Sequence, residues 1–284
     1  MHKILYIVLF NFVLNLYAQD IYQIKKFADE QYRLNNTNLA LKEYQRVFLF
    51  DKKHEFNDIY LKIANIFDKK NDYKQAIKYY NLAWQIIPND SIKNEIIFKK
   101  VLCQLKDENY FGALNELYEV SDSSSEYFKL KTKLYEGIAL FGVGDYKSSE
   151  KSLSELVNQK GKDSIKIIFK SFIKFNKKFN PDRIEKMSRI LPGLGQIYTG
   201  DIKNGINSLA LILAISYYAA LTAVNYSWFD GLLILSSWFT RYYNGGAGKA
   251  RELAEQKILK QKSKVYDEII KVIENNNILQ HATQ

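Results

Sequence analysis

A repeat with a period of 36 to 37 residues limits the fold of this 284-residue chain more than any other feature. Its clearest copy, residues 57–88, reads NDIYLKIANIFDKKNDYKQAIKYYNLAWQIIP. Apolar and small residues recur there at the i, i+3, i+4, i+7 spacing of a helix that buries one face. The pair Asn71-Asp72 interrupts this pattern and can cap a following helix, which Pro88 ends. The copy therefore predicts two helices joined by a short turn.

Small residues recur at one equivalent position in four copies: Ala40, Ala76, Ala113 and Ser149. Two antiparallel helices approach closely only where their side chains are small, so we expect the helices of each copy to cross at this position. Four copies exceed the roughly three that a stack needs to bury a continuous core. Only 3 Pro and 13 Gly occur in the chain, which disfavours a turn-dense β fold. The fold class is predicted to be all-α, with the repeat array at residues 19–156.

The best copy resembles a tetratricopeptide repeat. The residues that match its signature are Tyr60, Ile63, Ala64, Phe67, Tyr73, Ala76, Tyr80, Ala83 and Pro88. The resemblance implies a solenoid of helical hairpins whose first helices line a groove for a protein or peptide partner. Candidate groove residues are Lys62, Asn65 and Lys69, which can hold a carboxylate of the partner. The alternative is that these three side chains form an ordinary solvated face.

The N-terminal segment, residues 1–18, has the layout of a secretory signal peptide. Lys3 supplies a positive charge, the next fourteen residues carry none, and Ala18 provides a small residue before a cleavage site. An uncleaved anchor is the alternative, although a spanning helix requires about 20 apolar residues. Cleavage predicts a mature chain that begins in the bacterial periplasm.

Residues 157–187 are predicted to form a basic amphipathic helix that caps or links the array. Its basic residues are Lys160, Lys162, Lys166, Lys170, Lys174, Lys177, Lys178, Arg183 and Lys186, which contribute much of the net charge of +10. The same lysines can contact anionic lipid headgroups. Nucleic acid is the third partner that such a charge would suit, and the expected export argues against it, so no nucleic-acid partner is predicted.

Residues 188–248 are predicted to be a membrane domain of two hydrophobic helices. Residues 204–229 carry no charge, which is enough to cross a hydrocarbon core of about 30 Å. Residues 231–240 form a shorter second apolar run, so a full second crossing is open, and residues 225–230 would be the tip. A charged helix is predicted for the last segment, residues 249–284.

A motif precedes the first of these helices. The sequence LPGLGQIYTG resembles the PGxGQxYxG signature of small two-helix membrane domains of the bacterial envelope, which often follow tetratricopeptide repeats in Bacteroidota-like sequences. The residues concerned are Pro192, Gly193, Gly195, Gln196, Tyr198, Gly200, Asn204 and Gly205. Two interpretations remain open: polar side chains presented at headgroup depth, or residues that serve packing alone.

The two ends of the predicted hairpin differ in charge. Its tip has no Lys or Arg, whereas its outer flanks are basic, with Lys186 and Lys203 on one side and Arg241, Lys249 and Arg251 on the other. The positive-inside rule alone would place those flanks in the cytoplasm. A cleaved signal places the repeats in the periplasm, and the prediction follows the signal: the inner membrane, with periplasmic repeats.

Residues suited to catalysis or metal binding are scarce. The chain has one cysteine and 3 histidines far apart in sequence, so we expect no catalytic residues, no metal site and no cofactor. The predicted function is a membrane-anchored scaffold that binds a protein or peptide through its repeats. The alternative is a factor for membrane insertion or transport, in which Gln196, Tyr198 and Asn204, with Asn207, line a polar path.

Overall fold

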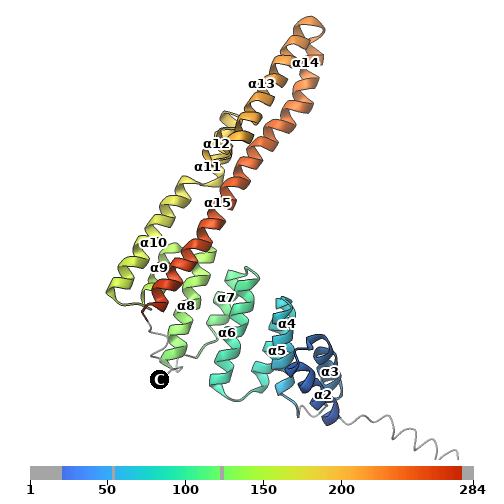
Figure 1. Ribbon diagram of the computed structural model, residues 1–284, viewed down its shortest axis with the longest axis vertical. Coiled ribbons are helices and arrows are strands. Elements are labelled where there is room, and N and C mark those ends of the chain that lie inside the picture. Colours follow the sequence, from blue (N-terminus) through green and yellow to red (C-terminus); the bar gives the residue numbers. More distant parts are fainter. Residues whose placement is uncertain (1–20, 53–54, 122–124, 277–284) are drawn as a thin grey trace, which may run out of the picture. The chain divides into compact units, whose positions relative to one another are not determined.

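A computed structural model describes residues 21–52, 55–121 and 125–276 of the chain (Figure 1). Within these ranges the protein is all-α, as predicted, and contains no β-strand. The chain divides into two compact units at Ser152 and Leu153, and each is described by itself. The predicted signal peptide, residues 1–18, lies outside the described residues.

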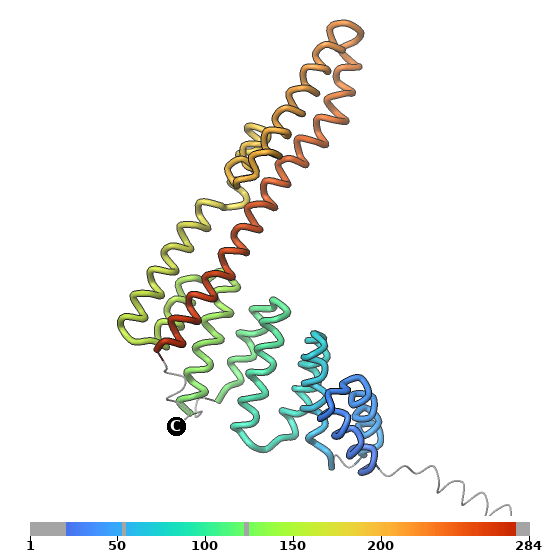
Figure 2. Tube along the Cα trace, in the orientation of Figure 1, coloured from blue at the N-terminus to red at the C-terminus, as the bar shows by residue number. Residues whose placement is uncertain are grey.

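The first unit is a series of helices joined by short turns, whose course the Cα trace follows (Figure 2). The helices are α2 (Ile21–Arg33), α3 (Thr37–Phe50), α4 (Asp58–Lys69), α5 (Tyr73–Ile86), α6 (Asp90–Lys106), α7 (Tyr110–Leu117), α8 (Glu126–Val143) and α9 (Tyr146–Ser154). The helices of the first three pairs, α2 with α3, α4 with α5 and α6 with α7, pack against each other. The helical hairpin is therefore the repeating element of this unit.

The turns of these hairpins repeat with the period of the sequence. A residue with positive φ stands in each turn: Asn35, Asn71, Glu108 and Gly144, at 61°, 60°, 56° and 98°. The next residue directly precedes the following helix, and the side chains of Asp72 and Asn109, in this position, each accept a hydrogen bond from a backbone N–H three residues on. Local chemistry thus ends one helix and starts the next at the same point of each copy.

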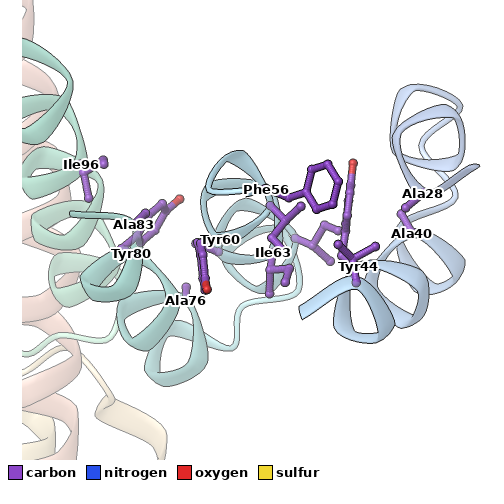
Figure 3. Packing of buried hydrophobic residues seen from close by; sticks show 14 of the residues in the cluster. Ala28, Ala40, Tyr44, Phe56, Tyr60, Ile63, Ala76, Tyr80, Ala83 and Ile96 are labelled. Atoms are coloured by element: carbon purple, nitrogen blue, oxygen red, sulfur yellow. The ribbon is translucent and has the colours of Figure 1, made fainter. Parts of the chain in front are cut away.

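The core of the first unit consists of the faces that the repeat predicts to be buried. Ala40, Ala76, Ala113 and Ser149 are all fully buried, as is Ala64 on the helix before Ala76. Larger side chains, Tyr44, Tyr80 and Ile63 among them, surround these close approaches (Figure 3). Edge-to-face ring contacts, such as Phe48 with Tyr60 at 5.7 Å between centroids, extend the packing.

The second unit is built on one long helical segment. Its helices are α10 (Gln159–Lys178), α11 (Pro181–Ile190), α12 (Leu194–Tyr198), α13 (Ile202–Asn225), α14 (Trp228–Ile234), a π-helical turn η1 (Leu235–Phe239) and α15 (Thr240–Glu274). Helices α10 and α11 pack along α15, and α13 packs against α14 and η1 (Figure 1). Helix α13 on one side and α14 with η1 on the other form the hairpin of the second unit, and its tip is a two-residue connection, Tyr226-Ser227.

The structure differs from the sequence prediction in the second limb of this hairpin. The prediction ends the limb near residue 240 and starts a separate helix at residue 249. Instead α14, η1 and α15 follow one another without a break from Trp228 to Glu274. The helix continues through Gly245, Gly246 and Gly248, and at Gly246 it lies close to α13: a Cβ there would stand 2.8 Å from Ser208 Oγ.

Candidate functional site

The PGxGQxYxG motif forms a crossing of backbones at the base of the second hairpin. Gly193 has a φ of 88°, and a Cβ there would stand 2.0 Å from the carbonyl oxygen of Gly205. A Cβ at Gly205 would in turn stand 2.7 Å from the carbonyl oxygen of Gly193. A Cβ at Gly195 would stand 2.5 Å from Ser188 Oγ. These three glycines allow α11, α12 and α13 to meet at distances that no other residue permits.

Gln196 lies at the centre of this crossing, with 2% of its surface exposed. Its Oε1 accepts a hydrogen bond from Ser188 Oγ of α11 at 3.0 Å. Its Nε2 donates to the carbonyl oxygen of Gly246 on α15 at 2.9 Å. Ser188 Oγ also accepts from the backbone N–H of Gly195 at 2.9 Å. The Gln196 amide thus links α12 to α11 and α15, and both its oxygen and its nitrogen form hydrogen bonds within the protein.

The Gln196 contacts predict a specific loss of stability on substitution. Gln196→Leu keeps the volume of the side chain but leaves the Gly246 carbonyl and the Ser188 hydroxyl without these partners, and an unsatisfied buried polar group costs about 1–3 kcal/mol. We expect the midpoint of thermal unfolding of the full chain in detergent to fall by several degrees. Gln256→Leu, at a glutamine that bonds only Glu252 on its own helix, is the control and should change the midpoint little. Equal midpoints in the two variants would contradict this account.

Among the other residues of the motif, Pro192 and Gly200 lie in turns, and Tyr198 and Asn204 have side-chain partners. Pro192 precedes the left-handed Gly193, and Gly200 has a φ of 92° just before α13 begins. The Tyr198 ring lies 5.8 Å from the Phe179 ring, centroid to centroid. Asn204 Nδ2 donates to both carboxylate oxygens of Asp201, the residue that caps α13. Of the two interpretations of the motif, the geometry favours packing, and no observation places Gln196 or Asn204 along a polar path.

The hairpin beyond the motif presents apolar side chains on its outside. Helix α13 is long and apolar enough to cross a membrane, and only 11% of its most apolar window is buried. Exposed large apolar residues continue along the second limb: Trp228, Phe229, Leu232, Leu233, Leu235 and Trp238. A soluble protein buries such a surface or presents it to a partner. The hairpin thus exposes apolar side chains on both limbs, and α13 alone has the length and composition of a membrane-crossing helix.

The basic helix α10 is aligned with the hairpin. It packs along α15 in the antiparallel direction. At the start of α10, the Asn158 N–H donates to Asn276 Oδ1, just after the end of α15. At the end of α10, the Phe179 ring lies 5.1 Å from Lys257 Nζ of α15. Since α14, η1 and α15 are continuous, α10 points along the hairpin axis (Figure 1). Its exposed lysines, Lys162, Lys166, Lys170 and Lys174, therefore form a row along that axis. A membrane crossed by the hairpin would meet one end of this row, not its length.

The candidate groove residues of the first unit are engaged inside the protein. Lys62 Nζ lies 2.6 Å from Asp29 Oδ1 and 2.7 Å from Asp58 Oδ2. Asn65 Oδ1 accepts hydrogen bonds from Tyr80 Oη at 2.8 Å and from Lys99 Nζ at 2.9 Å. Lys69 Nζ lies 5.8 Å from the centre of a tyrosine ring on α2. These contacts link one repeat to the next, so the three side chains have a structural role that sequence reasoning missed.

The repeat spacing relates these links to one another. Asp29 accepts from Tyr44 Oη and Lys62 Nζ, both at 2.6 Å, in the way that Asn65 accepts from Tyr80 and Lys99. The two sets are 36 to 37 residues apart at every position. A search for polar residues at the repeat period would have found them.

The Asp29 contacts predict a dependence of stability on pH. Burial raises the pKa of Asp29, but hydrogen bonds from Lys62, Tyr44 and Lys25 outweigh it and hold the pKa below its usual value. A lowered pKa in the folded state contributes stability above the unfolded value of about 3.9, and this contribution is lost as the pH falls through the folded pKa.

Asp29→Asn, which installs the residue of the next copy, should therefore destabilise the protein at pH 7, by about 1 kcal/mol or less because the pair is partly exposed. The difference from the wild type should be smaller at an acidic pH, below the lowered pKa of Asp29, than at pH 7. Urea unfolding at both pH values measures it. A difference that does not depend on pH would show that charge is not the cause.

A pocket of the first unit lies between α5, α6 and α7. Its volume is about 420 Å³, and its lining residues are Asn81, Trp84, Gln85, Lys100, Asn115, Glu116 and Glu119. Lys100, 7% exposed, forms an ion pair with Glu116 at its wall. Trp84 Nε1 is buried without a hydrogen-bond partner in the described structure. The pocket combines an aromatic wall with amide groups suited to a peptide backbone.

Side chains that commonly bind metal ions are not clustered within the described ranges. No group of three or more His, Cys, Asp or Glu side chains there could hold a metal ion. Cys103 is fully buried, and burial raises the pKa of its thiol to about 12, so it is protonated at neutral pH. Comparison with protein-family models found no match, and comparison with curated proteins found none.

Proposed function

We propose that this protein is a membrane-anchored scaffold of the bacterial cell envelope, whose helical-hairpin unit is a tetratricopeptide-type array that holds a protein or peptide partner. The observation that carries the proposal is the combination of a repeat unit with a hairpin whose helix α13 is uncharged from Asn204 to Asn225 and mostly exposed. An array of this kind offers a surface for a partner, and an apolar hairpin fixes its location.

The pocket beside Trp84 is the surface we assign to the partner. Asn81, Gln85 and Asn115 are exposed at its rim, and their amides can each donate and accept a hydrogen bond with an extended chain. Phe111, 68% exposed on the same helix as Asn115, and Tyr118, 85% exposed directly after that helix, add apolar contact area. We prefer this surface to the candidate groove, because Lys62 and Asn65 already bond residues of the protein.

The anchor is tested by fractionation of cell membranes and extraction with carbonate. We expect the wild type to require detergent, and the double variant Leu213→Glu, Leu221→Glu to become soluble. Both leucines are exposed in the structure, so their replacement leaves the internal packing intact. The matched control, Lys162→Glu with Lys170→Glu, adds the same number of carboxylates to α10 and should remain in the membrane. A wild type that is soluble without detergent contradicts the proposal.

The partner surface is tested by photocrosslinking in cells. A photoreactive residue in place of Asn115, at the pocket rim, should give a discrete crosslinked product. The same residue in place of Lys147, exposed on α9, should not. Identical products from the two positions would remove the assignment of the pocket.

A further inference from the structure

An apolar groove lies between the two limbs of the hairpin, beside the π-helical turn. Its volume is about 350 Å³, and its lining residues are Ala214, Ile215, Tyr218, Ile234 and Trp238. The turn η1 widens the helix at this point, because a π-helix closes its hydrogen bonds over five residues. Such turns occur often at functional sites.

Arg241 stands next to this groove. It follows Trp238 by three residues, the spacing of neighbours on a helix face, and Trp238 stacks on Tyr242 at 6.2 Å between centroids. Between Lys203 and Lys249 it is the only cationic residue in the sequence. No side-chain hydrogen bond or ion pair joins Arg241 to another residue that the structure describes.

The register of the hairpin gives the depth of Arg241. A Cβ on Gly246 would meet Ser208, and one on Gly231 would meet Ala223, so Arg241 is level with residues near Leu213. From Ser208 to the tip at Asn225 the helix rises about 26 Å, close to the thickness of a hydrocarbon core. Arg241 is therefore about 8 Å inside this stretch, counted from Ser208, a depth from which a long arginine side chain can extend to the interface, and the groove lies on the tip side of it.

This order matches the order of parts in a phospholipid. The guanidinium of an arginine binds a phosphate with two parallel hydrogen bonds. The apolar groove begins where an acyl chain attached to that phosphate would enter the bilayer. A zwitterionic headgroup such as phosphatidylcholine carries an ammonium group beside its phosphate and would bring this second cation close to Arg241. The headgroup of an anionic lipid such as phosphatidylglycerol carries no cation.

We propose that the hairpin binds an anionic phospholipid, with its phosphate on Arg241 and one acyl chain in the groove beside Trp238. The proposal rests on the membrane anchor of the proposed function. The lipid supplies the counter-charge that the described structure does not provide for Arg241, and it fills the space that the π-helical turn opens. Arg241 and Trp238 then determine which lipid surrounds the hairpin.

The chain contains three tryptophans, which makes a direct test practicable. With Trp84→Phe and Trp228→Phe, Trp238 reports on the groove; with Trp84→Phe and Trp238→Phe, Trp228 reports on the tip. The full chain is reconstituted into vesicles of four parts phosphatidylcholine and one part phosphatidylglycerol, with bromine on the acyl chains of one lipid or the other. Both brominated lipids are measured at the same tryptophan and therefore at the same depth. The ratio of their quenching thus depends on which lipid is enriched there and not on the depth.

At Trp238 we expect this ratio to show an enrichment of phosphatidylglycerol of about fivefold, equivalent to the ~1 kcal/mol of one basic residue near an anionic surface. Trp228 should show no enrichment. Arg241→Gln should reduce the ratio at Trp238 to that at Trp228, Arg241→Lys should retain part of it, and the control Lys249→Gln should leave it unchanged.

Three outcomes overturn the proposal. Equal ratios at Trp238 and Trp228 show that the groove has no preference. Enrichment that survives in Arg241→Gln shows that another group is responsible. A Trp238 that neither lipid quenches, while Trp228 is quenched, shows that protein, such as a second copy of the chain, covers the groove. If neither tryptophan is quenched, the membrane anchor itself fails.

Discussion

Gly193→Ala is expected to disrupt the junction of α12 and α13, whereas Gly200→Ala is expected to leave it intact. Both glycines have a left-handed backbone, with φ of 88° and 92°, so an alanine at either costs about 1–2 kcal/mol. Only at Gly193 would the new Cβ stand 2.0 Å from the carbonyl oxygen of Gly205; at Gly200 nothing lies within 4 Å. The clash forces the two backbones apart and adds about 1–3 kcal/mol or more.

The comparison of these two variants isolates the effect of the close approach. Thermal unfolding of the full chain in detergent, followed by circular dichroism, should give a lower midpoint for Gly193→Ala by several degrees. Proteolysis should cleave this variant within residues 190–205, and Gly200→Ala should resist there as the wild type does. If the two variants lose the same stability, backbone conformation alone accounts for Gly193.

Ala76→Phe is expected to have an effect of comparable size in the first unit. Ala76 is fully buried where α5 meets α4, opposite the equally buried Ala64, so a phenyl ring has no space and overpacks the crossing. The cost is about 1–3 kcal/mol or more. Because Lys62 and Lys99 link this copy to its neighbours, faster hydrogen exchange should extend into α2, α3, α6 and α7.

Lys78→Phe is the matched control, since it adds the same ring at an exposed position two residues away. It should leave both the unfolding midpoint and the exchange pattern near those of the wild type. A larger effect at Lys78 than at Ala76 would mean that the buried face of α5 is wrongly assigned.

The all-α class and the buried faces of the repeats could be predicted because they depend on local periodicity. Ala76 and Tyr80 lie one helical turn apart, and the period of 36 to 37 residues repeats the same stripe. The turns were visible for the same reason: Asn71-Asp72 has the left-handed residue and the cap that a tight connection requires. The anchor, the partner and the envelope location remain predictions.

The contacts of the polar residues could not be read from the sequence in the same way. Gln196 bonds Ser188 and Gly246, and the second of these lies fifty residues away on another helix. The same limitation applies to the second limb of the hairpin. Gly245 and Gly246 resemble a helix end locally, yet the helix continues, and the close approach of Gly246 to Ser208 is a tertiary contact that local composition does not reveal.

Because the helix from Trp228 to Glu274 is unbroken, the hairpin and the distal part of α15 are expected to tilt together. Beyond Lys249 it extends about 37 Å, so a hairpin that tilts by the ~20° typical of membrane helices displaces the far end by about 13 Å. Bilayer thickness sets that tilt, since a thinner membrane tilts a hairpin of fixed length further. If the hairpin spans a membrane as proposed, the position of the C-terminal end of α15 would depend on the thickness of that membrane.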